Sequence, residues 1–139
     1  AANAAAAHLL ARLAAHDGRD DWRRMAESAL EAWGTALSAE PRAFAESLIA
    51  LAFLREGPVE LAFIGADDDS GLELLRREVA RHFLPSRIIG HHDPAKGESA
   101  WPLLAGKSLV DGRPALYVCR NFACRAPVTR AEAVGAALR

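Results

Sequence analysis

The stretch that organises this chain is residues 117–129, YVCRNFACRAPVT. It holds both cysteines of the 139-residue sequence, Cys119 and Cys124. The apolar residues at its start, with the two before them, have the composition of a short buried strand, and Thr129 is a residue type that begins helices. The stretch therefore predicts a strand over 115–119, a loop, and a final helix that Thr129 caps and that ends at about Leu138.

Two further strands and a helix are predicted upstream of this stretch. Residues 59–65, VELAFIG, and 87–90, RIIG, are short apolar runs of the kind found in strands covered on both faces. A helical pattern lies between them and follows the helix caps offered by residues 67–70. A strand, a helix and a strand in about thirty residues make a βαβ unit. Residues 58–139 thus predict a small, mostly parallel, three-stranded α/β subdomain.

The first half of the chain, residues 1–57, predicts three antiparallel helices, and the boundary between the halves is expected near Gly57-Pro58. Apolar residues at helical spacing mark the faces expected to be buried: Leu9, Leu10 and Leu13 in the first helix, Trp22, Met25, Ala29, Trp33 and Leu37 in the second, and Phe44, Leu48, Leu51 and Ala52 in the third. Three such helices bury little by themselves, so they indicate a fragment of a larger helical array. The whole chain is predicted to be of the α/β class, as an α+β fragment.

Composition argues against several kinds of partner and location. The sequence is 51% hydrophobic and 25% charged with a formal net charge of −1, which argues against nucleic acid or anionic lipid as a partner. We find no window of about eighteen uninterrupted apolar residues, so no membrane span is expected. Because two cysteines do not make a disulfide scaffold and no signal peptide is recognised, a cytoplasmic location with reduced cysteines is the expectation. The opening without Met predicts a piece of a longer protein.

One ligand site is predicted where the strands end. Parallel sheets bind ligands beyond the carboxyl ends of their strands, and those ends hold Asp67, Asp68, His91 and Asn121. The alternative, which the residue types alone favour, is that these side chains only cap helices and form turns. The acidic run lacks the rest of a calcium motif, and no glycine pattern for phosphate binding follows the first strand. We therefore predict no metal and no cofactor.

The pair Cys119 and Cys124 allows three interpretations. Four residues lie between them, unlike the two of thioredoxin-type redox centres, and two thiolates cannot complete a structural zinc site. The pair can be reduced structural thiols, which the spacing favours, a reversible disulfide, or part of a metal site. Only as a reversible disulfide would the two residues be catalytic.

Several segments together resemble a known family. They are residues 3–14, 59–65, PLLAGK at 102–107, ALYVCRNFAC at 115–124 and PVT at 127–129. The set is similar to the carboxyl-terminal end of the thioredoxin-domain-containing family that includes spermatogenesis-associated proteins, and the Cys-x4-Cys-x2-Pro-Val-Thr ending is its most specific part. The resemblance implies an amino-terminal thioredoxin-like domain joined to an α/α toroid similar to six-hairpin glycosidases. Residues 1–57 would then be the last hairpins of that toroid.

The resemblance implies an architecture more than a reaction. This chain would be a fragment of a thioredoxin-like/α,α-toroid protein, with carbohydrate-related or redox-linked activity in the whole protein and none in the fragment. Its partner would be the rest of the parent chain, and the isolated fragment would self-associate through helix faces left exposed. Two alternatives stay open, namely a thiol-disulfide redox module that uses Cys119 and Cys124, and a purely structural or interaction domain.

Overall fold

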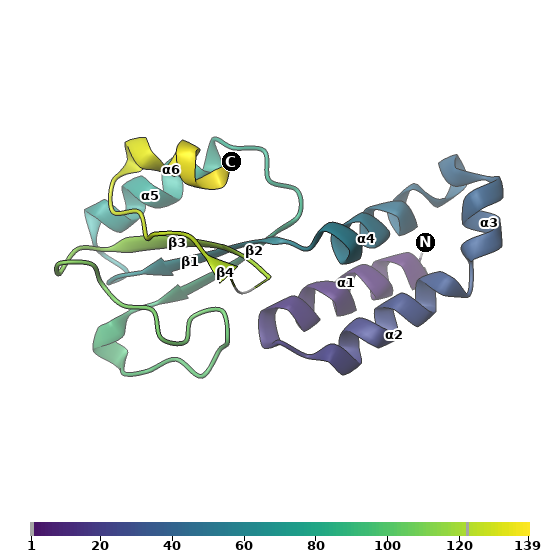
Figure 1. Cartoon of the computed structure of the whole chain (residues 1–139), viewed down its shortest axis with the longest axis horizontal. Helices are drawn as coiled ribbons and strands as arrows, with labels where there is room; N and C mark the ends of the chain where they lie inside the picture. The colour runs from purple at the N-terminus through teal and green to yellow at the C-terminus, as the bar shows by residue number, and fades with distance from the viewer. Residues whose placement is uncertain (1, 122) are drawn as a thin grey trace. The chain divides into compact units, whose positions relative to one another are not determined.

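The computed structural model describes residues 2–121 and 123–139, so Ala1 and Phe122 lie outside the described residues. The chain divides into two compact units, Ala1–Pro58 and Val59–Arg139. The first unit is helical and the second contains a four-stranded sheet with helices, which confirms the predicted α/β class (Figure 1). Within the described residues, no helix is long and apolar enough to cross a membrane.

The helical unit contains more helices than predicted. Its elements are α1 (Ala2–Asp17), α2 (Asp20–Glu31), α3 (Gly34–Ala39), the 3-10 turn η1 (Pro41–Phe44) and α4 (Ala45–Glu56). The predicted second helix is thus two helices, because the chain turns before Gly34, a residue with low helix propensity. Helix α1 packs against both α2 and α4 (Figure 1).

The three longer helices pack mainly through small side chains, which differs from the prediction. The buried residues are Ala4, Ala7, Ala11 and Ala14 in α1, Ala26 and Leu30 in α2, and Ser47, Ala50, Phe53 and Leu54 in α4. Several large predicted core residues are instead exposed, namely Leu9 (58%), Leu13 (38%), Met25 (57%), Trp33 (47%) and Leu48 (37%). The prediction was wrong because alanines and leucines both recur at helical spacing on α1. Alanine lets helix axes approach more closely, so the alanine face is the one that packs.

The sheet of the second unit is mixed. Its strands are β1 (Val59–Ile64), β2 (Arg87–His92), β3 (Ala115–Arg120) and β4 (Ala123–Cys124), in the order β2-β1-β3-β4. Strand β1 pairs with β2 in parallel and with β3 antiparallel, and β3 pairs antiparallel with β4. The prediction of three mostly parallel strands was therefore wrong in number and direction. A parallel β3 would need a crossover, usually through a helix, but residues 93–114 hold only the short turn η2 (Pro94–Lys96).

Different segments cover the two faces of the sheet (Figure 1). On one face, α5 (Ser70–Ala80) and α6 (Ala131–Leu138) close a core that includes Leu61, Phe63, Leu72, Leu75, Leu116, Val118 and Val134. On the other face, the connection after β2 places Leu103 and Leu104 against Gly90. A Cβ on Gly90 would lie 2.9 Å from Leu104 Cδ2 and 3.0 Å from Leu103 Cδ2, so glycine permits this close packing.

The two helices of this unit begin differently. Helix α5 is capped by Asp69, whose Oδ1 accepts hydrogen bonds from the backbone N of Gly71 at 2.7 Å and of Leu72 at 3.3 Å. Helix α6 begins at Ala131 after Arg130, which has an extended backbone and no side-chain cap. The predicted cap at Thr129 was therefore one residue early, because the chain stays extended beyond the bridge between Leu116 and Val128.

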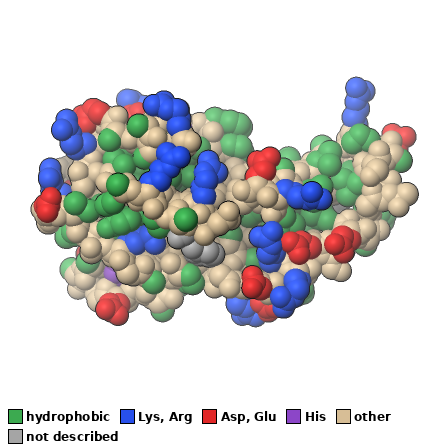
Figure 2. Space-filling view, in the orientation of Figure 1, with side chains coloured by type: hydrophobic (Ala, Val, Ile, Leu, Met, Phe, Trp, Pro, Cys, Tyr) green, Lys and Arg blue, Asp and Glu red, His purple; other side chains and the backbone are tan. Residues whose placement is uncertain are grey.

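Charged side chains do not form a field of one sign on the visible face of either unit. Figure 2 shows Lys and Arg mixed with Asp and Glu, with apolar side chains between them. This distribution agrees with the net charge of −1.

The packing around Gly90 gives a test of the fold. Gly90→Val should lower the free energy of unfolding of the α/β unit by about 1–3 kcal/mol, because the larger side chain must displace Leu103 and Leu104. Chemical denaturation measures the loss. Gly34→Ala is the matched control, since an added Cβ there meets nothing within 4 Å, and it should be neutral or slightly stabilising. Equal losses in both variants would contradict the described packing.

Candidate functional site

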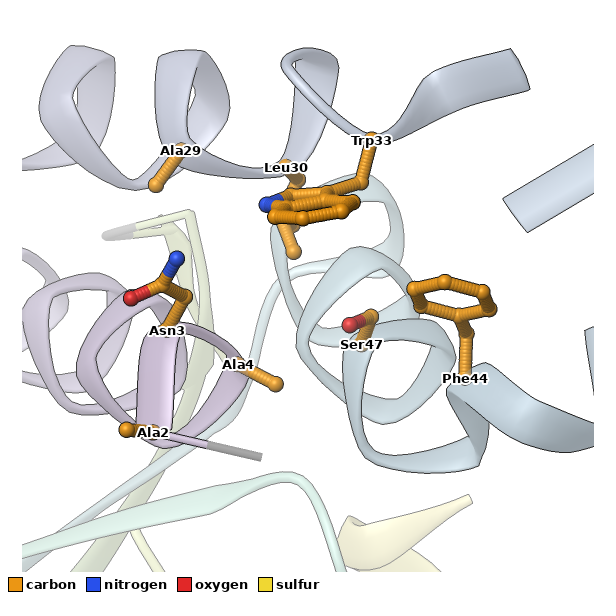
Figure 3. A pocket seen from close by; sticks show the side chains of 8 residues that line it. All are labelled: Ala2, Asn3, Ala4, Ala29, Leu30, Trp33, Phe44 and Ser47. Atoms are coloured by element: carbon orange, nitrogen blue, oxygen red, sulfur yellow. The ribbon is translucent and has the colours of Figure 1, made fainter. Parts of the chain in front are cut away.

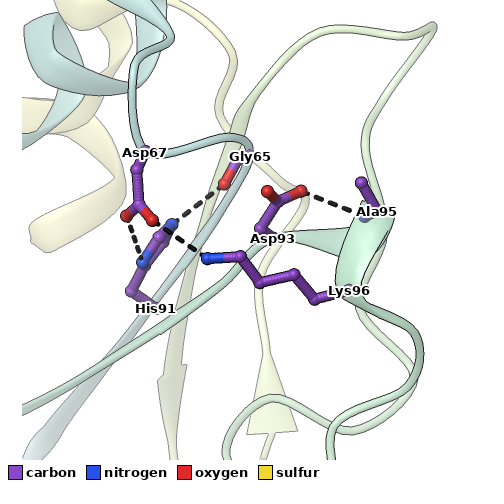
Figure 4. Close-up of polar contacts among 6 residues, drawn as sticks. All are labelled: Gly65, Asp67, His91, Asp93, Ala95 and Lys96. Atoms are coloured by element: carbon purple, nitrogen blue, oxygen red, sulfur yellow. Dashed lines mark hydrogen bonds and ion pairs between the residues drawn. The ribbon is translucent and has the colours of Figure 1, made fainter.

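The carboxyl ends of β1 and β2 meet at one edge of the sheet and bring charged side chains together (Figure 4). The ring of His91 lies between two acceptors, with Nε2 2.9 Å from the carbonyl oxygen of Gly65 and Nδ1 3.3 Å from Asp67 Oδ1. Lys96 Nζ donates to the other carboxylate oxygen of Asp67 at 3.1 Å. Asp67 therefore links the loop after β1 to both β2 and η2.

The electrostatics of this cluster centre on Asp67. Lys96, through its hydrogen bond and its charge, holds the pKa of Asp67 below its ordinary value, and His91 contributes less to the same direction. Asp67 in turn raises the pKa of Lys96. Because both nitrogens of His91 face acceptors, both contacts are satisfied when each nitrogen carries a proton. Since the side chains of Asp67 and Lys96 are 64% and 66% exposed, the pair contributes little to stability.

The structure brings together only part of the predicted ligand site. Asp67 and His91 are in contact, and His91 lies in β2 instead of in a loop. Asp68 is exposed in the turn after β1. Asn121 follows the carboxyl end of β3, which lies at the opposite edge of the sheet because β3 runs antiparallel to β1. Strand direction, which the hydrophobic pattern does not encode, therefore separates Asn121 from the other three residues.

Cys119 and Cys124 form a disulfide between β3 and β4, with an S–S distance of 2.07 Å. The expectation of reduced thiols is therefore corrected. The two residues are directly opposite each other in the ladder. Only two residues separate the strands in the sequence, and the first of them, Asn121, has a φ of 50°. Cys119 is 1% exposed, whereas Cys124 is exposed. Cys119 is therefore the buried residue of the disulfide and Cys124 the exposed one.

One acidic residue with a possible site role escaped the sequence analysis. Glu60 is the second residue of the otherwise apolar strand β1 and is 3% exposed. It is directly opposite Cys119 in the ladder between β1 and β3. A single carboxylate in an otherwise apolar buried strand is the signal that could have drawn attention to it.

The helical unit contains an open cavity of about 280 Å³ between α1, α2 and α4 (Figure 3). Trp33 and Phe44 lie on its wall with ring centroids 6.3 Å apart, and the hydroxyl of Ser47 and the amide of Asn3 are its polar groups. A second cavity of about 280 Å³ lies beside His91 and is lined by Arg76, Arg87 and several apolar side chains. In the part of the chain that the structure describes, no three His, Cys, Asp or Glu side chains gather as metal ligands.

Comparison with known proteins finds similarity to one group of relatives. The chain is 27% identical over 131 residues to spermatogenesis-associated protein 20 of Homo sapiens. The matched residues cover 92% of this chain and 17% of that protein. The Rattus norvegicus and Mus musculus proteins of the same name are 27% and 26% identical over the same shares. The chain thus spans about a sixth of the length of the curated relatives it matches. The similarity is consistent with the family resemblance of the sequence. No family model matches the chain, and no solved structure matches it.

The link between Lys96 and Asp67 predicts a shifted carboxyl titration. The pKa of Asp67, followed by NMR of its side-chain carbonyl carbon, should lie below 3.8 and rise toward that value in Lys96→Gln, because the hydrogen bond and the positive charge are lost. The ion pair between Lys96 and Asp67 is thus fully formed at pH values above the ordinary pKa of a carboxyl group, and it weakens as the pH falls through the lowered pKa of Asp67. Lys96→Arg keeps the charge and should retain most of the shift. The same pKa in the wild type and in Lys96→Gln would contradict the contact.

Proposed function

We propose that this chain is the carboxyl-terminal part of a longer thioredoxin-domain-containing protein with an α/α toroid, and that its helical unit serves there to dock against the rest of the toroid. The similarity to spermatogenesis-associated protein 20 supports this assignment, since it extends over most of the chain and a small part of the relatives. Any carbohydrate-related activity is proposed for the whole protein, with this chain in a structural and interaction role.

The observation that carries the proposal is the distribution of apolar side chains around α1 and α4. At 3.6 residues per turn, Leu9 and Leu13 lie on the side of α1 opposite its buried alanines, and they are 58% and 38% exposed. Ile49, which lies one turn before the buried Phe53 on α4, is 56% exposed. Helices that are apolar on both sides are typical of the interior of a larger protein. Helix α2 differs, since its outer face is charged.

The docking role predicts self-association of the 139-residue chain. Sedimentation velocity should show concentration-dependent association. The exposed apolar side chains of α1 and α4 in one copy would bind those of another copy when the rest of the toroid is absent. The double substitution Leu9→Gln/Leu13→Gln should raise the dissociation constant about tenfold or more, since each half-exposed leucine loses burial worth roughly 1 kcal/mol.

The matched control for this experiment is Arg24→Gln/Glu31→Gln on the exposed, charged face of α2. It changes two exposed residues and should leave the association unchanged. A wild-type chain that stays monomeric at every attainable concentration, or an equal effect of the two double substitutions, would count against the docking role.

A second candidate function is thiol-disulfide exchange by Cys119 and Cys124, and the disulfide between β3 and β4 favours it. The two sulfurs differ in access, which gives them different roles. The exposed Cys124 would be the sulfur that external thiols attack and that forms mixed disulfides, and the buried Cys119 would leave and later displace the external thiol.

The difference in access predicts different alkylation rates in single-cysteine variants. Cys119→Ser retains the exposed Cys124 and should react with iodoacetamide about tenfold or more faster than Cys124→Ser, which retains the buried Cys119. Mass spectrometry follows the reaction. In guanidinium chloride the two variants should react at similar rates, which controls for intrinsic reactivity. Similar rates in the folded variants would contradict the assigned roles.

A further inference from the structure

Glu60 is a carboxyl group in an unusual position. It is 3% exposed, in a strand whose other five residues, Val59 and residues 61–64, are apolar and buried. Acidic side chains are rarely buried to this extent, because an ionised carboxylate loses its hydration there. Such a residue is retained when its charge or its proton is used, or when its polar neighbours hold it in place.

The strand register places Glu60 in one row with the disulfide. Glu60 is opposite Cys119 in the pair of β1 and β3, and Cys119 is opposite Cys124 in the pair of β3 and β4. Side chains directly opposite each other lie on the same face of a sheet with Cβ atoms about 5 Å apart. The row therefore contains the buried Glu60, the buried Cys119 and the exposed Cys124, in this order.

The titratable side chains described on this face of the sheet include Lys107, Tyr117 and His92. Lys107, from the connection after β2, interacts electrostatically with Glu60, and burial lowers the pKa of Lys107 while the charge of Glu60 opposes that shift. Its Nζ is 6.0 Å from the ring centroid of Tyr117, whose hydroxyl donates to the carbonyl oxygen of Ser108. Strand β2 places the apolar Ile88 opposite Glu60 and carries His92 on the same face four residues further along.

We infer that the carboxyl group of Glu60 gives a proton to the Cys119 sulfur when the disulfide opens and takes it back when the disulfide closes. The inference rests on the second candidate function, thiol-disulfide exchange, and adds to it the group that handles the proton. A thiolate formed at a buried sulfur lacks the hydration that stabilises its charge, so a nearby proton donor makes Cys119 a better leaving group.

The chemistry balances with a low-molecular-weight thiol as the reductant. The thiolate of that molecule attacks the exposed Cys124 sulfur, the S–S bond breaks, and its electron pair goes to Cys119, which receives the proton of Glu60. A second thiolate then attacks the mixed disulfide on the external sulfur and releases Cys124 as a thiolate, which takes a proton from solvent. One protein disulfide, two small thiols and the Glu60 carboxyl group thus yield one protein dithiol, one small disulfide, the Glu60 carboxylate and one proton released to solvent, and the reverse sequence uses that carboxylate as the base for Cys119.

Exchange kinetics with reduced glutathione and glutathione disulfide test the inference. Glu60→Gln, which keeps the side-chain volume, should slow opening and closing of the disulfide by about tenfold to a hundredfold and remove one titration from the rate-pH profile. Glu60→Asp should restore part of the rate. In the Cys119→Ser background, Glu60→Gln should leave the reaction of Cys124 with glutathione disulfide unchanged, because that reaction does not involve Cys119.

A second variant covers the case in which Glu60→Gln does not fold. Lys107→Met removes the cation that interacts with Glu60, and the loss of this positive charge favours the protonated form of the carboxyl group. The rate-pH profile of the exchange should therefore shift to higher pH. The same substitution in the Cys119→Ser background is the control for this shift. If glutathione does not reduce the wild-type disulfide at any pH, the exchange function fails and the inference fails with it. If the wild type exchanges while Glu60→Gln has an unchanged rate and profile, or Lys107→Met shows no shift, the proton role of Glu60 is overturned and the exchange function stands.

Discussion

The α/β unit depends on the burial of β1 on both of its faces. All six residues from Val59 to Ile64 are buried, so the strand needs cover on each side and a neighbour along each edge. Helices α5 and α6 supply the cover on one side, and the connection after β2 supplies it on the other. Strands β2 and β3 supply the neighbours. This double coverage is why a connection without a helix is still held tightly, with Leu103 and Leu104 packed onto Gly90.

The sequence predicts the positions of most helices and strands, but it does not predict the direction of strand β3 or the face of helix α1 that is buried. Apolar runs locate β1, β2 and β3, but a period of two residues is the same in a parallel and an antiparallel strand. The signal for the antiparallel β3 was the lack of a helical pattern between 93 and 114. Direction in turn separates Asn121 from Asp67 and His91, so the place of one of the four predicted site residues depended on information that the pattern does not contain. In α1, the choice between the leucine and alanine faces depends on how closely its neighbours approach, which is a tertiary property.

The pairing of the cysteines was within reach of the sequence. Two residues five apart lie directly opposite each other when a two-residue turn connects their strands, and Asn is a residue type that such turns favour. Reading residues 119–124 as a hairpin instead of a loop would have predicted both β4 and the disulfide. The pairing of Glu60 with Cys119 belongs to the ladder between β1 and β3, whose direction and register the hairpin does not fix, so the sequence could not place the acid in one row with the sulfurs.

The short strand β4 also limits how the sheet can meet another copy of itself. One edge of the sheet ends in a strand of two residues that a covalent bond ties to β3, which offers little backbone to an incoming strand. The other edge is β2, with six residues, an exposed Arg87 and a half-exposed Ile89. Within the described residues β2 pairs with no strand besides β1, so edge-to-edge pairing of this sheet would use β2. The disulfide thus makes the two edges of the sheet unequal as templates for an incoming strand.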